Sequence, residues 1–182
     1  MNNINKRTIS EKQIKLRKKL WPELDESKLW VSKGNKKIGY ITIPRTMPII
    51  MKIMDSLSKN KPISSVFLEL WCRTFDERMV TLNRHHEYAF HSGFSGQRAV
   101  QTWKERINIL FDLGFIDLKP GPSGEISYAL VFNPYHVIRD HYERKTPGIV
   151  ESMYNALLER ANEIKATDLD DDNQENECGL EK

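Results

Sequence analysis

The sequence predicts a mainly α fold with a small β-hairpin and helical extensions. Residues 79–134 place a short β-prone run, two helices joined by a tight turn, and two strands in that order along the chain. One buried helix face is indicated by a stripe at spacings of three and four residues, formed by Val100, Trp103, Ile107, Leu110 and Phe111. Glycine and proline at 120–124 predict the turn between the two strands. Together these patterns predict a winged helix-turn-helix, an α+β domain, over residues 36–145.

The helix-turn-helix is predicted from its capping and turn residues. Asn83 offers a side-chain oxygen that can cap a helix running through Phe90, which we expect to end near Ser92. Gly93 then supplies the left-handed position of a helix C-terminus, and Ser95 is placed to cap the helix that follows. The second helix of such a pair most often enters the major groove of duplex DNA, so the segment predicts a function as well as a fold.

Proline, glycine and apolar spacing predict the elements around this segment. Strands are expected at 38–43, 79–82, 115–119 and 126–132, and helices at 10–20, at about 48–57, from Ser64 or Ser65, at 135–142, and from 149 to about 166. The last helix has an apolar face at 149–164 that needs a partner. That partner is either the domain itself or another copy of the chain, and the second alternative predicts a homodimer.

The face of the second helix opposite its apolar stripe is the candidate for base recognition. Arg98 can bind guanine through two hydrogen bonds, Gln101 can do the same to adenine, and Thr102 can contact a base edge or a thymine methyl group. Glu105 would be repelled by phosphate unless it accepts a hydrogen bond from a cytosine amino group. The alternative interpretation is that this face is simply the solvated side of an amphipathic helix.

A second set of polar residues is expected to position the phosphates of the DNA backbone. Its members are basic side chains or hydrogen-bond donors before, within and after the helix pair and in the N-terminal arm: Arg84, Ser95, Gln97, Lys104, Lys119, Lys15, Lys18 and Lys19.

Charge changes along the chain far more than its total of +3 indicates. Residues 1–62 hold 15 Lys and Arg against 5 Asp and Glu, residues 63–150 hold 10 against 10, and residues 151–182 hold 3 against 10. The basic arm at 1–35 suits a phosphate-binding segment, and a solubilising extension is an equally good interpretation. We expect 167–182 to be a disordered acidic tail, because it has too few apolar residues to fold.

Several classes of protein are disfavoured by what the sequence lacks. No apolar run approaches the length of a membrane span and the first residues are polar, so a cytoplasmic protein with no membrane partner is expected. Cys72 and Cys178 predict neither a disulfide nor a zinc site. The spacing of His85, His86 and His91 does not suit a helical metal site, and no catalytic motif is present. We therefore expect no enzyme, no metal and no cofactor.

Part of the chain resembles a known class of domain. The residues that carry the resemblance are Arg98, Trp103, Arg106, the Gly-Phe-Ile at 114–116 and the Asn-Pro at 133–134. They resemble the winged-helix domains of bacterial DNA-binding proteins encoded by plasmids and mobile elements. The resemblance covers about a third of the chain, and it implies DNA binding in replication, partition or transcription regulation. The hairpin departs from a strongly DNA-binding wing, because its tip offers only Lys119 and also carries Glu125.

The expected function is therefore a duplex DNA-binding protein, either a regulator or a replication or partition accessory of a bacterial mobile element. The main alternative is a winged helix that acts as a protein-protein interaction module, because the central segment carries no net charge. An enzyme of nucleic-acid processing comes third, since nothing in the sequence indicates a carboxylate cluster.

Overall fold

The computed structural model describes residues 41–59, 61–74, 79–166 and 169. The chain divides into two compact units, Met1–Tyr40 and Ile41–Lys182, and all the described residues belong to the second unit. The basic arm expected at 1–35, including Lys15, Lys18 and Lys19, lies outside the described residues, as does the helix expected at 10–20. Of the predicted acidic tail, only Leu169 is described, and it packs against the core.

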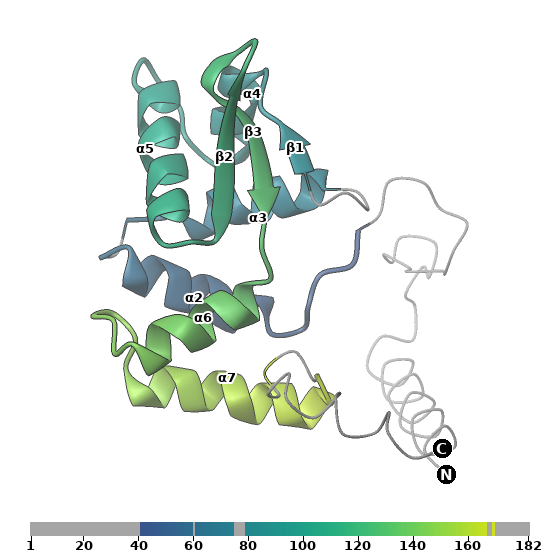
Figure 1. Ribbon diagram of the computed structural model, residues 1–182, viewed down its shortest axis with the longest axis vertical. Coiled ribbons are helices and arrows are strands. Elements are labelled where there is room, and N and C mark those ends of the chain that lie inside the picture. The colour runs from purple at the N-terminus through teal and green to yellow at the C-terminus, as the bar shows by residue number, and fades with distance from the viewer. Residues whose placement is uncertain (1–40, 60, 75–78, 167–168, 170–182) are drawn as a thin grey trace, which may run out of the picture. The chain divides into compact units, whose positions relative to one another are not determined.

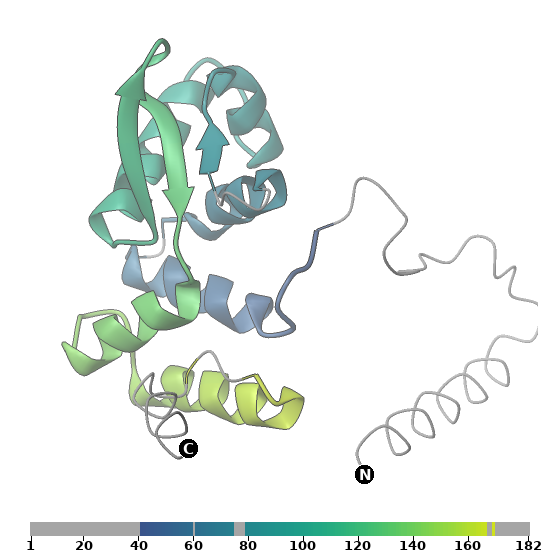
Figure 2. The same ribbon diagram turned by 45° about the vertical axis from the view of Figure 1, so that its right-hand side comes forward.

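The second unit is an α+β fold, as the sequence predicts. Within the described residues the elements are α2 (Met47–Leu57), α3 (Ser64–Arg73), β1 (Met79–Thr81), α4 (His85–His91), α5 (Ala99–Asp112), β2 (Ile116–Gly121), β3 (Gly124–Val131), α6 (Pro134–Glu143) and α7 (Glu151–Ile164). The three strands form one antiparallel sheet in the order β1-β3-β2. The N-terminus of α5 and the tip of the hairpin lie at one end of the unit, and α6 and α7 lie at the other (Figures 1 and 2).

The hairpin is longer than its sequence predicts. The segment 120–124 was expected to be all turn, yet β2 extends to Gly121 and β3 begins at Gly124. Pro120 is tolerated in β2 because β2 is an edge strand and because the pairing with β3 is irregular between Lys119 and Gly121, where Pro120 lies. A strand was expected at 38–43, but residues 41–43, the described part of this range, form no strand. Thr42 there accepts a hydrogen bond from the Trp71 indole at 3.0 Å.

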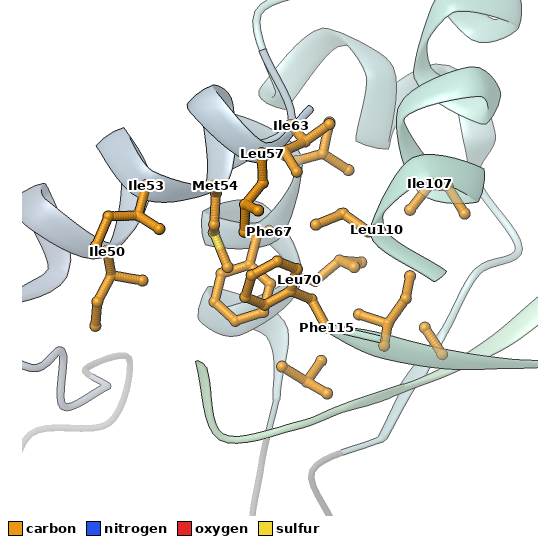
Figure 3. Close-up of a cluster of buried hydrophobic side chains, with 14 of the residues drawn as sticks. Ile50, Ile53, Met54, Leu57, Ile63, Phe67, Leu70, Ile107, Leu110 and Phe115 are labelled. Atoms are coloured by element: carbon orange, nitrogen blue, oxygen red, sulfur yellow. The ribbon is translucent and has the colours of Figure 1, made fainter. Parts of the chain in front are cut away.

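Buried apolar side chains from both the helices and the sheet form one core (Figure 3). The residues of α2 that face inward recur at spacings of three and four, as expected for one helix face: Met47, Ile50, Ile53, Met54 and Leu57. Phe67 of α3 meets Phe115 edge to face, with ring centroids 5.9 Å apart. Each fully buried side chain of this size stabilises the fold by about 1.5–3 kcal/mol relative to an exposed one.

The start of α3 is stabilised by a residue of α2. A serine cap was expected, but the cap position is Ile63, which has no side-chain oxygen to offer. Asp55 supplies the acceptor instead: its Oδ1 accepts from the backbone N–H groups of Ile63 and Ser64 at 2.9 Å each, and its Oδ2 accepts from the Ser64 hydroxyl at 2.7 Å. A carboxylate at a helix N-terminus is also favoured by the helix dipole.

The C-terminal helices pack against α2. Asn133 caps α6 by accepting from the N–H of Tyr135 at 3.1 Å. In α7 the residues Tyr154, Leu157 and Ala161 are buried, and α7 contacts α2. The turn between α6 and α7 is fixed at Gly148, whose carbonyl accepts from the Ser56 hydroxyl at 2.6 Å. Of the two partners predicted for the apolar face at 149–164, the domain itself is therefore the one observed.

Candidate nucleic-acid interface

Two short-range turns set the geometry of the helix pair α4 and α5. Gly93 has φ +90°, the left-handed conformation predicted for it, and the N–H of Phe94 bonds to the carbonyl of Ala89 at 2.9 Å. Gly96 has φ +82° and extends the turn, so α5 begins at Ala99. The cap expected from Ser95 is wrong for this reason, since the cap position is Arg98. The cap expected from Asn83 is also wrong, because α4 begins one residue later with Arg84 at its cap position.

One face of α5 is locked into the core. Trp103, Ile107 and Leu110 are fully buried, as predicted. The Trp103 ring stacks on Tyr88 of α4 with an interplanar angle of 21°, and it also contacts the ring of His85. Phe111 was placed in this stripe but is 44% exposed. It lies one residue beyond Leu110, which rotates it about 100° away from the buried face.

The opposite face of α5 carries the residues predicted to recognise bases. Arg98 and Gln101 are exposed and Thr102 is half-buried, so all three belong to the accessible side of the helix and its first turn. Glu105 is also exposed, and the Gln101 Nε2 group donates to its Oε1 at 3.3 Å. Lys104 is half-buried. Neither Arg98 nor Lys104 has an ion-pair partner within the part of the chain that the structure describes.

The residues predicted to position phosphates differ in their availability. Ser95 and Gln97 are exposed in the turn before α5. Arg84 forms a 3.2 Å ion pair with Glu87, and Lys119 forms a 3.0 Å ion pair with Asp117. The Lys119 hydrogen bond holds the pKa of Asp117 below its usual value. Asp117 therefore partly offsets the charge of Lys119, although the Lys119 side chain is 72% exposed.

A network of charged side chains that the sequence did not reveal joins α3 to α4. Arg73 bonds to Glu69 at 2.5 Å and to Glu87 at 2.8 Å, and its guanidinium lies over the Tyr88 ring, 4.3 Å from the centroid. Hydrogen bonds from Arg73, and then from Arg84, hold the pKa of Glu87 below its usual value. The Glu69–Arg73 spacing of four residues on α3 was the only local signal of this network.

A groove of about 320 Å³ lies between α5 and the tip of the hairpin. From α5 it is lined by Gln101, Lys104, Glu105 and Asn108, and from the hairpin by residues 123–126, with His85 of α4 also contributing. The Nε2 atom of His85 lies 3.0 Å from the carbonyl oxygen of Ile126, which ties α4 to β3 beneath the groove. Glu125 is evident in the sequence, but its place in the same groove as the α5 residues depends on how β2 and β3 pair in the hairpin.

Several apolar side chains are exposed away from this groove, among them residues on α4 and on the sheet. Phe90 on α4 is 72% exposed. On the outer face of the sheet, Met79 pairs with Leu130 across β1 and β3, and both side chains are exposed, as is the nearby Phe132.

No group of three or more His, Cys, Asp or Glu side chains in the described ranges is arranged to hold a metal ion. No described helix is long and apolar enough to cross a membrane. Comparisons of the chain with protein-family models, curated proteins and solved structures give no match.

Proposed function

We propose that the second unit is a winged helix that binds duplex DNA, with α5 lying in the major groove. The observation that carries this proposal is the two-sided character of α5. Its inner face is fixed by Trp103, Ile107 and Leu110, while its outer side carries Arg98 and Lys104, which have no ion-pair partner among the described residues, beside the polar Gln101. A helix held this rigidly can present a constant set of side chains to base edges.

The order of elements supports the same proposal. A helix, a short strand, two helices and a two-stranded hairpin follow one another as α3, β1, α4, α5, β2 and β3. In proteins of this class the second helix of the pair is the one whose N-terminal residues contact bases. Arg98, Gln101 and Thr102 occupy those N-terminal positions here.

Phosphate contacts are proposed for the region around the start of α5. Ser95, Gln97 and Lys104 are accessible there, and Arg84 joins them if DNA displaces its bond to Glu87. The first N–H groups of α5 have no side-chain cap, and such groups favour anions. Because carboxylates offset the cations of this surface, much of the attraction to DNA should come from the basic arm, which includes Lys15, Lys18 and Lys19.

The cellular process is proposed from the sequence resemblance alone. A cytoplasmic regulator, or a replication or partition accessory of a bacterial mobile element, would need such a DNA-binding unit. A homodimer through 149–164 would read two half-sites one DNA turn apart. That dimer would have to use surface that α2 leaves uncovered, since Tyr154, Leu157 and Ala161 are buried within the chain. A monomeric mass by light scattering would exclude it.

The proposal is tested by fluorescence anisotropy with the full-length protein and a random-sequence DNA duplex at about 50 mM and about 200 mM salt. We expect binding that weakens steeply with salt, and that weakens again in Arg98→Ala. Arg144→Ala is the matched control, because Arg144 is an exposed arginine at the end of α6, and α6 lies at the end of the unit opposite the N-terminus of α5 (Figure 1). Absence of binding at the lower salt concentration would refute the proposal.

A protein-protein interaction module is the second candidate. The exposure of Phe90 on α4, together with that of Met79, Leu130 and Phe132 on the sheet, favours it. Exposed apolar patches commonly mark surfaces that bind other proteins. The two candidates respond differently to mutation: Phe90→Ser should leave DNA binding by α5 intact but weaken association with a protein partner. A nucleic-acid-processing enzyme has no comparable observation in its favour.

A further inference from the structure

The groove between α5 and the hairpin has an unusual balance of charge for a surface that meets DNA. Two carboxylates line it, Glu105 from α5 and Glu125 from the hairpin tip, against the single lysine Lys104. A phosphate group placed there would be repelled by both carboxylates. Side chains that accept hydrogen bonds instead favour a group that donates them, and the bases of DNA carry such donors in the major groove.

The hydrogen bond between Gln101 and Glu105 determines what these two side chains offer. Gln101 and Glu105 lie one helical turn apart, and the Gln101 Nε2 group donates to Glu105 Oε1 at 3.3 Å. This bond uses one of the two N–H groups of the Gln101 amide, so the other N–H can still donate and the carbonyl oxygen can still accept. Among the described residues, the second carboxylate oxygen of Glu105 has a long contact, 3.8 Å, with Arg106. The Glu105 carboxylate is therefore held by Gln101 and offers acceptors on its exposed side.

The Glu105 carboxylate, unlike the Gln101 amide, offers acceptors alone. Adenine places its N7 acceptor beside its N6 amino group, so a carboxylate that accepts from N6 also faces N7. Cytosine presents an amino donor at N4 with no acceptor of its own in the major groove.

We infer that Glu105 is a specificity-determining residue, which accepts a hydrogen bond from the N4 amino group of a cytosine in the major groove. Gln101 is its positioning residue, since it holds the carboxylate by the bond described above. The inference rests on the proposed DNA-binding function, and it names the base that this part of α5 selects. The partner of that cytosine is a guanine, whose N7 and O6 acceptors suit Arg98 or Lys104.

The experiment is a selection of bound duplexes from a randomised DNA library by the full-length protein, followed by sequencing. The wild type should enrich a site with a fixed cytosine, and Glu105→Ala, which removes the acceptor, should lose the preference for cytosine at that position. In the enriched duplex, replacing this cytosine by N4-methylcytosine removes the major-groove donor and keeps the base pair. That replacement should weaken wild-type binding about fivefold or more, and it should have little effect on Glu105→Ala.

Glu159→Ala is the control, because Glu159 is an exposed glutamate on α7, and α7 lies at the end of the unit opposite the N-terminus of α5 (Figure 1). Gln101→Ala should keep the cytosine but lower its enrichment, a change that a purely structural role for Gln101 would not produce. A cytosine preference that persists in Glu105→Ala would overturn the inference. Failure of the wild type to bind any duplex would refute the proposed function itself, which is a different outcome.

Discussion

Asp55→Ala should destabilise the second unit through the start of α3. The Asp55 carboxylate accepts the N–H groups of Ile63 and Ser64 and the Ser64 hydroxyl, all at 2.7–2.9 Å. Ile63 is fully buried and Ser64 is 5% exposed, so water cannot easily replace the lost acceptor. A lost helix cap typically costs about 0.5–2 kcal/mol, and a hydrogen bond to a charged group contributes about 1.5–3 kcal/mol. We therefore expect Asp55→Ala to lower the free energy of unfolding by about 2–3 kcal/mol.

Asp55→Asn separates the hydrogen bonds from the charge. Asparagine keeps one oxygen that can accept both backbone N–H groups, and its NH₂ group can donate to the Ser64 hydroxyl. Its cost should be about 1 kcal/mol, because the neutral acceptor is weaker and the favourable interaction with the helix dipole is reduced. The order of stability should therefore be wild type, Asp55→Asn, Asp55→Ala.

Urea denaturation followed by circular dichroism measures these differences. Asp112→Ala is the control, because Asp112 is an exposed aspartate at the end of α5 that makes no hydrogen bond or ion pair among the described residues. It should change stability by no more than about 0.5 kcal/mol. The reasoning is refuted if Asp55→Ala costs as little as this control, or if Asp55→Asn is as unstable as Asp55→Ala.

Three further predictions concern the helical turn, the charge network and the hairpin. Gly148→Ala should lower the free energy of unfolding, measured by thermal denaturation, by about 2 kcal/mol or more, because the new Cβ would lie 2.8 Å from a carbonyl oxygen of α2 and the backbone has φ +109°. Gly93→Ala should lower it by less, because Gly93 has φ +90° but no atom within contact distance of the new Cβ. Glu87→Gln should be less stable than the wild type at about pH 7, and the difference should disappear as the pH falls through the lowered pKa of Glu87, because only the ionised carboxylate is stabilised. A difference that persists at about pH 2 in urea denaturation would contradict this. Lys119→Ala should change the salt dependence of DNA binding by less than Lys104→Ala, because Lys119 pairs with Asp117; loss of Lys104 should reduce the slope by about 0.9 if Lys104 contacts one phosphate.

The helical part of the fold was predictable because its information is local. Ile50, Ile53 and Leu57 show the buried face of α2 by spacing alone, and Gly93 marks the end of α4 because a left-handed residue favours glycine. The errors fall where local rules compete with tertiary contacts. Serine was expected to cap α3, but Asp55, eight residues before Ile63, satisfies the same N–H groups. No local pattern distinguishes such a distant cap from an ordinary exposed aspartate.

The candidate interface was only partly predictable for a related reason. Helical periodicity placed Arg98 and Gln101 on the accessible side of α5, since that depends on spacing within one helix. The approach of Glu125 to α5 depends on the register of β2 against β3 and on the length of the hairpin, and β2 is longer than the turn sequence indicated. The engagement of Lys119 by Asp117 likewise depends on side-chain geometry at the edge of the sheet.

The position of α2 between the two groups of helices has a consequence for how the unit unfolds. Asp55 joins α2 to α3, while Ser56, the next residue, joins α2 to the turn before α7. Two adjacent residues in one turn of α2 therefore bond to both groups of helices: Asp55 bonds to α3, which packs against α5, and Ser56 bonds to the turn before α7. Local opening of either group of helices would disturb the other group through this turn of α2. The slowest-exchanging amides of α3, α5 and α7 should therefore show similar protection in hydrogen–deuterium exchange, as expected of one cooperative unit.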